Sequence, residues 1–190
     1  MDGILFDRHL TTAEIEAGMP YVLGSPTNNG TLEMIVARPA IGKRKVLEAG
    51  ELSVAEGLTG DNWAARGSRR TVDGSAHPEM QINIMNYRFA ELIAGHRDRV
   101  PLAGDQLFVD LDLSEANIPT GTGLEIGTAR LVITTIPHLG CKKFVERFGL
   151  AAMKYANSEY GRENHLRGVN ARVIRSGKFR TGDAVTITGR

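Results

Sequence analysis

The chain has 190 residues, a net charge of +1 and 42% hydrophobic residues, which suits one soluble domain with a sizeable core. No apolar run approaches the ~20 residues of a transmembrane helix, and the small net charge gives no bulk attraction to nucleic acid or membrane. Asp2 and Asp7 stand where a secretory signal would carry positive charge, and there is a single cysteine. We therefore expect a reducing, cytoplasmic location.

Residues 1–30 are interpreted as an N-terminal extension. Thr11 and Glu14 have the spacing of a capping box, which predicts a short helix that runs to Gly18, before Pro20. A loop rich in Ser, Asn and Gly follows and leads into the remaining chain. Residues 31–190 are predicted to form the main domain.

Strand patterns dominate that domain. Residues 32–38 form a β-rich run, and residues 45–52 alternate loosely around Ala49-Gly50, as a hairpin would. Two further runs are apolar at every second position, with Phe108 as an exception in the second of them. These and the later predicted strands cover residues 80–85, 106–113, 124–136, 169–174 and 184–188.

Helices are fewer. Asn86 is placed to cap a helix that ends at Gly95. A second helix is predicted over 142–148 with Gly149 just past its end, and a third over 150–157. Strands and helices do not alternate, so a doubly wound α/β fold is disfavoured. The pattern predicts a mainly-β protein with a few helices, built as a β-barrel or closed sheet.

Cys141 stands between Gly140 and the pair Lys142-Lys143, at the start of a predicted helix. The helix dipole and the lysine charges both favour the thiolate, which is the form that attacks, carries sulfur or binds a soft metal. Free cysteines are also often buried as small apolar residues, so a structural role and a reactive role both remain open. His138 is a partner base or ligand in one reading and a surface or core histidine in the other.

Basic residues are concentrated late in the chain. Residues 141–180 hold ten Lys or Arg and three Glu, which indicates an anion-binding face or a solvated surface. Within it, residues 161–173 place Arg and His between glycines, and Arg donors suit phosphate or carboxylate. Residues 57–67 bring two glycine turns together but lack the ending of a phosphate-binding P-loop. Gly-Asp at Asp105 and Asp183 is read as turn structure.

Taken in order, these segments resemble the MOSC domain, named for the C-terminal domain of molybdenum-cofactor sulfurases. The matching segments are Gly57 to Asp61, Gly121 to Gly127, Cys141, Arg167 to Val173, and Gly177 to Val185. The resemblance covers roughly residues 57–190 and leaves the first thirty residues outside. Many members place Pro next to the cysteine, whereas Pro137 lies four residues before it here.

The resemblance implies a MOSC-type β-barrel in which Cys141 is the functional residue. One implied role is a sulfur carrier or sulfurtransferase that holds a persulfide for delivery to a metal or molybdenum cofactor. The alternative is a module that binds the molybdenum cofactor, with the cysteine as molybdenum ligand. Because no pyridoxal-phosphate domain is evident, the carrier role implies a cysteine desulfurase-type partner as sulfur donor.

The predicted site surrounds Cys141 with groups that bind a small anionic cofactor or substrate. No cofactor is expected to be required for folding, no nucleic acid or membrane partner is expected, and no oligomeric state is predicted. The residues assigned to the anionic group are Lys142, Lys143, Arg162, His165, Arg167, Asn170, Arg172, Asn62 and Arg66.

Overall fold

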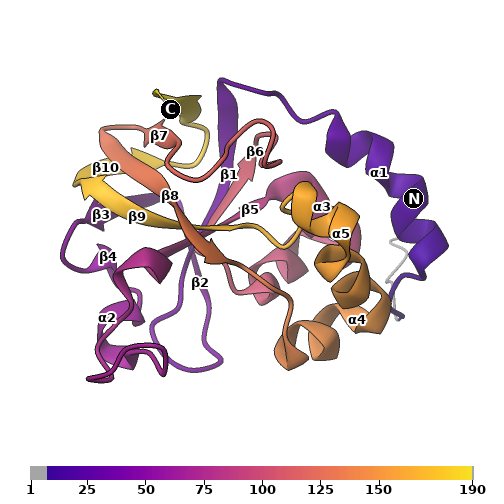
Figure 1. Ribbon diagram of the computed structural model, residues 1–190, viewed down its shortest axis with the longest axis horizontal. Coiled ribbons are helices and arrows are strands. Elements are labelled where there is room, and N and C mark those ends of the chain that lie inside the picture. Colours follow the sequence, from indigo (N-terminus) through magenta and orange to yellow (C-terminus); the bar gives the residue numbers. More distant parts are fainter. Residues whose placement is uncertain (1–7, 190) are drawn as a thin grey trace.

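The computed structural model describes residues 8–189, so the first seven residues of the predicted extension lie outside it. It is a mainly-β protein whose seven-stranded barrel is closed by pairing of β1 with β11, and β2 extends from β1 (Figure 1). The strands of this sheet, in barrel order, are β11 Ala184–Ile187, β7 Gly123–Ile126, β8 Ala129–Pro137, β9 Val169–Arg175, β5 Ile82–Asn86, β6 Leu107–Asp110 and β1 Gly30–Ala37, followed by β2 Lys45–Leu47.

A second, three-stranded sheet corrects the hairpin predicted over 45–52. It consists of β10 Gly177–Arg180, β3 Ala49–Ser53 and β4 Gly57–Leu58, so β2 and β3 belong to different sheets. A Cβ on Gly50 would lie 2.9 Å from the ring of Phe179. The glycine therefore permits a close strand–strand approach, and the hairpin prediction mistook this packing requirement for a turn.

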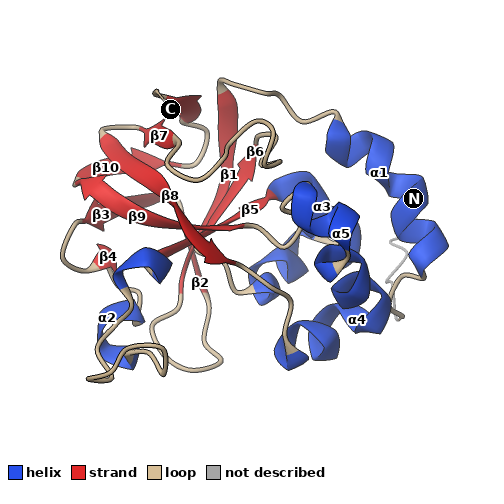
Figure 2. Cartoon of the chain, viewed as in Figure 1, coloured by secondary structure: helices blue, strands red, loops and turns tan. Residues whose placement is uncertain are grey.

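Four helices, α1, α3, α4 and α5, gather on one side of the barrel, and α2 lies apart from them below β4 (Figure 2). Helix α3 begins after Asn86 as predicted, because the Asn86 side chain accepts from the Phe89 N–H. It ends at Gly95, whose backbone is left-handed. The helices predicted on either side of Gly149 are also confirmed and meet at this residue, whose φ is 89°. The helical elements are α1 Thr12–Leu23, α2 Trp63–Arg66, α3 Tyr87–Ala94, α4 Lys142–Asn157 and α5 Glu159–Glu163, with 3-10 turns η1 Pro78–Met80 and η2 Arg97–Ala103.

The first helix is longer than predicted. Thr11 and Glu14 form the expected capping box, but α1 continues through Gly18 and Pro20. A Cβ at Gly18 would lie 2.5 Å from Leu92 of α3, so this glycine lets the two helices approach closely. Burial of apolar residues such as Val22 on α1 outweighs the local cost of the proline.

Two apolar cores lie on opposite faces of the barrel wall. Leu107 and Val109 of β6 belong to the core inside the barrel, and Phe108 between them belongs to the core under α1, α3 and α4. The exception in the alternating pattern thus marks the face that carries the helices. Among the described residues, none of the helices combines the length and the apolar character required to cross a membrane.

Candidate functional site

The thiol is accessible. Cys141 occupies the N-cap position of α4 with extended backbone angles, and its side chain is exposed and does not cap the helix. Lys142 and Lys143, which follow it, are exposed as well. The thiol therefore lies at the N-terminal end of α4, followed in the chain by two exposed ammonium groups.

The backbone before the thiol is held by one side chain. Asn157 at the end of α4 accepts from the Gly140 N–H at 2.8 Å and donates to the Gly140 carbonyl at 3.0 Å. A Cβ on Gly140 would lie 3.0 Å from Met153. The loop that presents Cys141 is therefore fixed against the helix that follows it.

A cavity of about 210 Å³ lies beside this loop and is lined by residues of β8, α5 and β9. Leu139, two residues before the thiol, contributes to its wall. Four of the predicted anion-binding residues line it: Arg162, His165, Arg167 and Asn170. Cys141 itself is not among the lining residues, so the thiol stands outside the cavity.

His165 is held in a strained backbone conformation at the cavity wall. Its φ is 43°, in the left-handed region that non-glycine residues rarely adopt. Its Nδ1 lies 2.6 Å from the Leu113 carbonyl, which can only accept, so Nδ1 carries a proton. Nε2 faces the cavity region with Glu115 at 3.9 Å.

Arg167 forms the base of the cavity and is 7% exposed. Its Nη1 donates to both oxygens of the fully buried Asp105, at 3.0 and 2.7 Å, and its guanidinium lies over the Phe144 ring at 4.9 Å. Its Nε has no hydrogen-bond partner in the described part of the chain. A buried N–H without a partner is costly.

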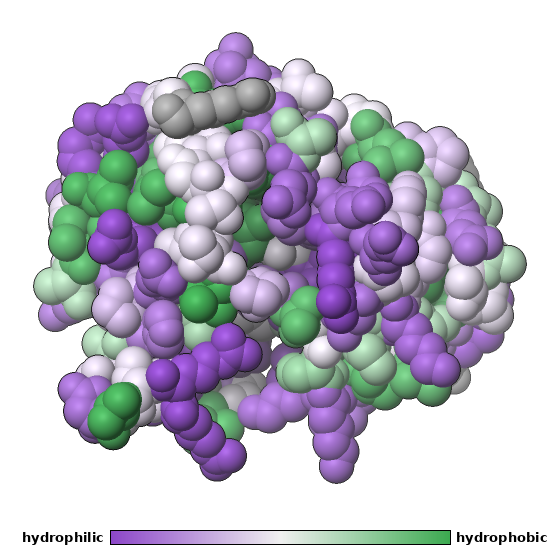
Figure 3. Space-filling view, viewed as in Figure 1, coloured by the Kyte–Doolittle hydropathy of each residue, from purple (hydrophilic) through white to green (hydrophobic). Residues whose placement is uncertain are grey.

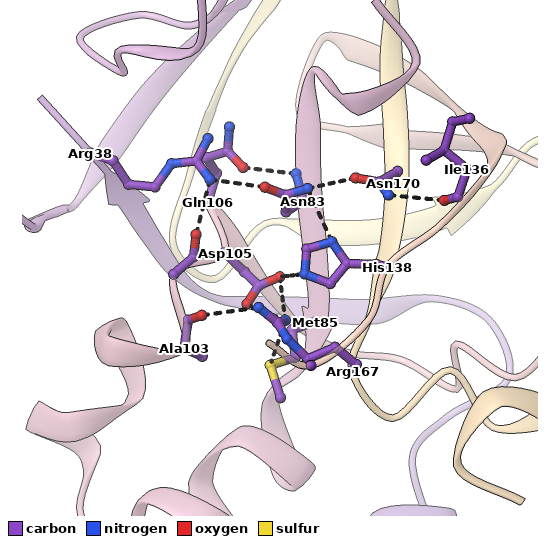
Figure 4. A network of polar contacts seen from close by, with 12 residues as sticks. Arg38, Asn83, Met85, Ala103, Asp105, Gln106, Ile136, His138, Arg167 and Asn170 are labelled. Atoms are coloured by element: carbon purple, nitrogen blue, oxygen red, sulfur yellow. Dashed lines mark hydrogen bonds and ion pairs between the residues drawn. The ribbon is translucent and has the colours of Figure 1, made fainter. Parts of the chain in front are cut away.

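His138 lies against the same carboxylate. Its Nε2 is 3.3 Å from Asp105 Oδ1, without the alignment of a hydrogen bond, and its Nδ1 is 3.2 Å from the Asn83 amide nitrogen (Figure 4). Burial, with a further contribution from Arg167, lowers the pKa of His138 to about 4. The imidazole is therefore neutral at neutral pH.

A chain of side chains fixes the tautomer of this histidine. Arg38 donates to Asn83 Oδ1 at 2.8 Å, so the Asn83 NH₂ group faces His138 and Asn170. His138 Nδ1 must then accept, which leaves the proton on Nε2, toward Asp105. Asn170 completes the network by donating to the Ile136 carbonyl at 2.9 Å.

The remaining predicted residues lie away from the cavity. Arg172 is an exposed residue of β9, and Asn62 and Arg66 belong to the start and end of α2. None of them lines the cavity, and neither do Lys142 and Lys143. The structure thus gathers four of the predicted residues and leaves the others on separate surfaces.

The sequence interpretation missed the buried partners of the site. Asp105 was read as part of a turn, yet its side chain is fully buried between Arg167 and His138. Arg38 and Asn83 were not singled out at all. The available signal was polar residues inside apolar strand patterns, because buried polar groups need partners.

No protein-family model matches the chain, and no curated protein matches it in sequence. Solved structures do match. The YuaD protein (APC1665) of Bacillus subtilis is 15% identical with a TM-score of 0.63, covering 83% of this chain and 94% of its own. YiiM of Escherichia coli is 19% identical with a TM-score of 0.54, covering 84% and 70%. YiiM of Geobacillus stearothermophilus is 14% identical with a TM-score of 0.50, covering 86% and 74%. These neighbours are MOSC-domain-type proteins, which supports a MOSC-like fold.

Proposed function

We propose that the protein is a sulfur carrier of the sulfurtransferase type, with Cys141 as the atom that holds the transferred sulfur. The observation that carries the proposal is the exposure of this thiol at the start of α4, on a loop fixed by Asn157 and beside a cavity lined by two arginines, Arg162 and Arg167. Such a thiol is accessible to a partner protein and requires a reducing compartment to stay free.

The chemistry is an exchange between sulfur atoms. The Cys141 thiolate attacks the outer sulfur of a donor persulfide, forms a new S–S bond and releases the donor as its thiolate. An acceptor nucleophile then attacks the outer sulfur on Cys141, and the Cys141 thiolate leaves. No net oxidation occurs within the chain, because each step exchanges one sulfur–sulfur bond for another and releases a thiolate. The donor in this proposal is a cysteine desulfurase-type protein.

We place the negative group of the acceptor in the cavity, with its nucleophilic atom reaching out to the sulfur on Cys141, which does not line the cavity. Arg162, His165, Arg167 and Asn170 line the cavity, together with the exposed Glu115. Guanidinium groups bind carboxylates and oxyanions through parallel hydrogen bonds. The acceptor proposed for this site is therefore a small molecule with a negative group.

The residues around the cavity do not fit a molybdenum cofactor whose metal is bound by Cys141. That arrangement needs the thiol to face the space that holds the cofactor, and Cys141 does not line the cavity. The cavity volume of about 210 Å³ is also below the ~300–1,000 Å³ usual for ligand sites. No step is assigned to this cofactor.

The first step is tested by loading the thiol. The protein is incubated with a low-molecular-weight persulfide, alkylated and examined by mass spectrometry. We expect one added sulfur at Cys141 in the natural chain and none in Cys141→Ser. A natural chain that gains no more sulfur than Cys141→Ser would remove the proposal.

The second step is tested with the loaded protein and sulfite, a small anionic acceptor that becomes thiosulfate. Arg162→Gln should load as the natural chain does and release thiosulfate more slowly. Arg180→Gln, which alters an exposed arginine of β10 outside the cavity, is the matched control. Equal rates of thiosulfate release in Arg162→Gln and Arg180→Gln would show that the cavity does not take part in the acceptor step.

A further inference from the structure

The segment Pro101–Gly104, at the end of η2, is surrounded by arginine side chains. Each of its four successive carbonyl oxygens accepts a hydrogen bond from a different guanidinium. The pairs are Arg44 Nε to Pro101 at 3.2 Å, Arg147 Nη1 to Leu102 at 2.6 Å, Arg167 Nη2 to Ala103 at 3.0 Å and Arg38 Nη1 to Gly104 at 3.0 Å.

Two of these four cations are neutralised and two are not. Arg38 forms an ion pair with Asp61 at 2.8 Å, and Arg167 forms one with Asp105 at 2.7 Å. Within residues 8–189 neither Arg44 nor Arg147 has a carboxylate at ion-pair distance, and their hydrogen bonds go to backbone carbonyls. The segment therefore carries two uncompensated positive charges close together.

The two uncompensated guanidinium groups border the same small space. A Cβ built on Gly104 would lie 3.3 Å from Arg44 Nη2 and 3.6 Å from Arg147 Nη1. Glycine leaves that space unfilled, and its φ of 92° also disfavours a side chain there. Both arginines are only partly exposed, and burial together with the charge of Arg147 lowers the pKa of Arg44. Partly buried like charges repel each other unless an anion lies between them.

We infer that Arg44 and Arg147 form a binding site for a phosphate-class oxyanion over Gly104. The planar guanidinium donors that the carbonyls do not use match the oxygens of such a group. Neither arginine lines the cavity beside Cys141, so this site is separate from the proposed acceptor site. The β1–β2 connection, which carries Arg44, lies along the lower edge in Figure 1, and Figure 3 shows hydrophilic side chains along that edge. Arg147 lies in the second turn of α4.

The test is calorimetric titration at low ionic strength with inorganic phosphate and, in a second arm, glycerol phosphate. We expect binding to the natural chain and a loss of at least about tenfold in the double variant Arg44→Gln/Arg147→Gln, the size of one charge-assisted hydrogen bond. Arg69→Gln, at an exposed arginine before η1, should bind as the natural chain does. If glycerol phosphate binds more tightly than inorganic phosphate, the site is assigned to a phosphorylated molecule. If both bind equally, it is assigned to free phosphate.

Thermal unfolding of each variant checks that the fold is kept. If Arg44→Gln/Arg147→Gln does not fold, the double variant Arg44→Lys/Arg147→Lys, which keeps both charges, replaces it. The lysine pair should bind more weakly than the natural chain because it loses the planar donors. Equal phosphate binding in the natural chain and the folded glutamine pair would overturn the inference. The inference would also be overturned if only Arg162→Gln lost phosphate affinity, because the anion would then bind in the cavity. Persulfide loading at Cys141 is not needed for any of these measurements.

Discussion

Arg38 donates to the side-chain oxygen of Asn83 at 2.8 Å, and this hydrogen bond sets the orientation of the Asn83 amide in the buried network. Arg cannot accept, so Asn83 must present its NH₂ group to His138 and Asn170. The proton on His138 is thereby placed on the nitrogen that faces Asp105. Arg38, the residue after β1, thus determines the tautomer of His138, the residue after β8.

The buried pair of Arg167 and Asp105 should be essential to the fold. Arg167→Met leaves the Asp105 carboxylate buried with His138 as its remaining neighbour, and we expect a loss of about 3–5 kcal/mol of unfolding free energy. Arg175→Met breaks the exposed pair with Glu125 and should cost at most about 1 kcal/mol. Urea unfolding of both variants measures the difference in unfolding free energy. Equal losses would show that the buried pair of Arg167 and Asp105 matters no more to the fold than the exposed pair.

Stability should fall in acid because of His138. Its folded pKa of about 4 lies below the value of 6.5 in an unfolded chain, so the unfolded state binds more protons between these limits. The contribution of neutral His138 to the unfolding free energy is therefore complete above about pH 6.5. It decreases toward pH 4 by on the order of 3 kcal/mol. Urea midpoints across this range, compared with His138→Gln, measure the effect. An unchanged pH slope in the variant would refute it.

Asn157→Ala should release the loop before the thiol. Two hydrogen bonds to Gly140 are lost, worth about 1 kcal/mol each, so the Gly140 amide should exchange with solvent about tenfold faster or more. Asn164→Ala removes a similar amide bond, to the Tyr160 carbonyl, and serves as the control. Hydrogen exchange followed by mass spectrometry reads the outcome. Unchanged protection at Gly140 in Asn157→Ala would show that the loop is held by other contacts.

Gly149→Ala should be strongly destabilising. The residue has a φ of 89°, and a Cβ there would lie 2.6 Å from His9, so strain and a clash add to a loss of about 2–4 kcal/mol. Gly42→Ala, at a φ of 77° with nothing within 4 Å, carries the strain alone and should cost about 1 kcal/mol. Thermal unfolding compares them. Similar losses would mean that the contact with His9 adds nothing.

The sequence predicted those elements whose local signals agree with their packing. Asn86 and Gly95 bound α3 as expected, because a cap and a left-handed glycine act within one turn. Gly18 and Gly50 misled the interpretation for the opposite reason. Each is needed for a close contact with a distant residue, Leu92 and Phe179 respectively, which no local pattern reveals.

The candidate site could be predicted where its residues lie on one segment. Arg162, His165, Arg167 and Asn170 follow each other along the chain into β9, and the cavity gathers them. Asp105 could not be foreseen as their partner, because it is contributed by a turn 62 positions away from Arg167. The separation of Cys141 from the cavity wall likewise depends on the path of the loop, which residue types do not specify.

The pairing of Gly30 with Val185 and of Thr31 with Ala184 joins strands from opposite ends of the chain. During synthesis β1 emerges long before β11, so the edge of β1 at Gly30 and Thr31 stays without its strand partner until residues 184–187 have been made. Closure of the seam must then be a late event in folding. Nascent chains that stall short of residue 184 would expose that edge to other strands, which makes them the species most prone to aggregate.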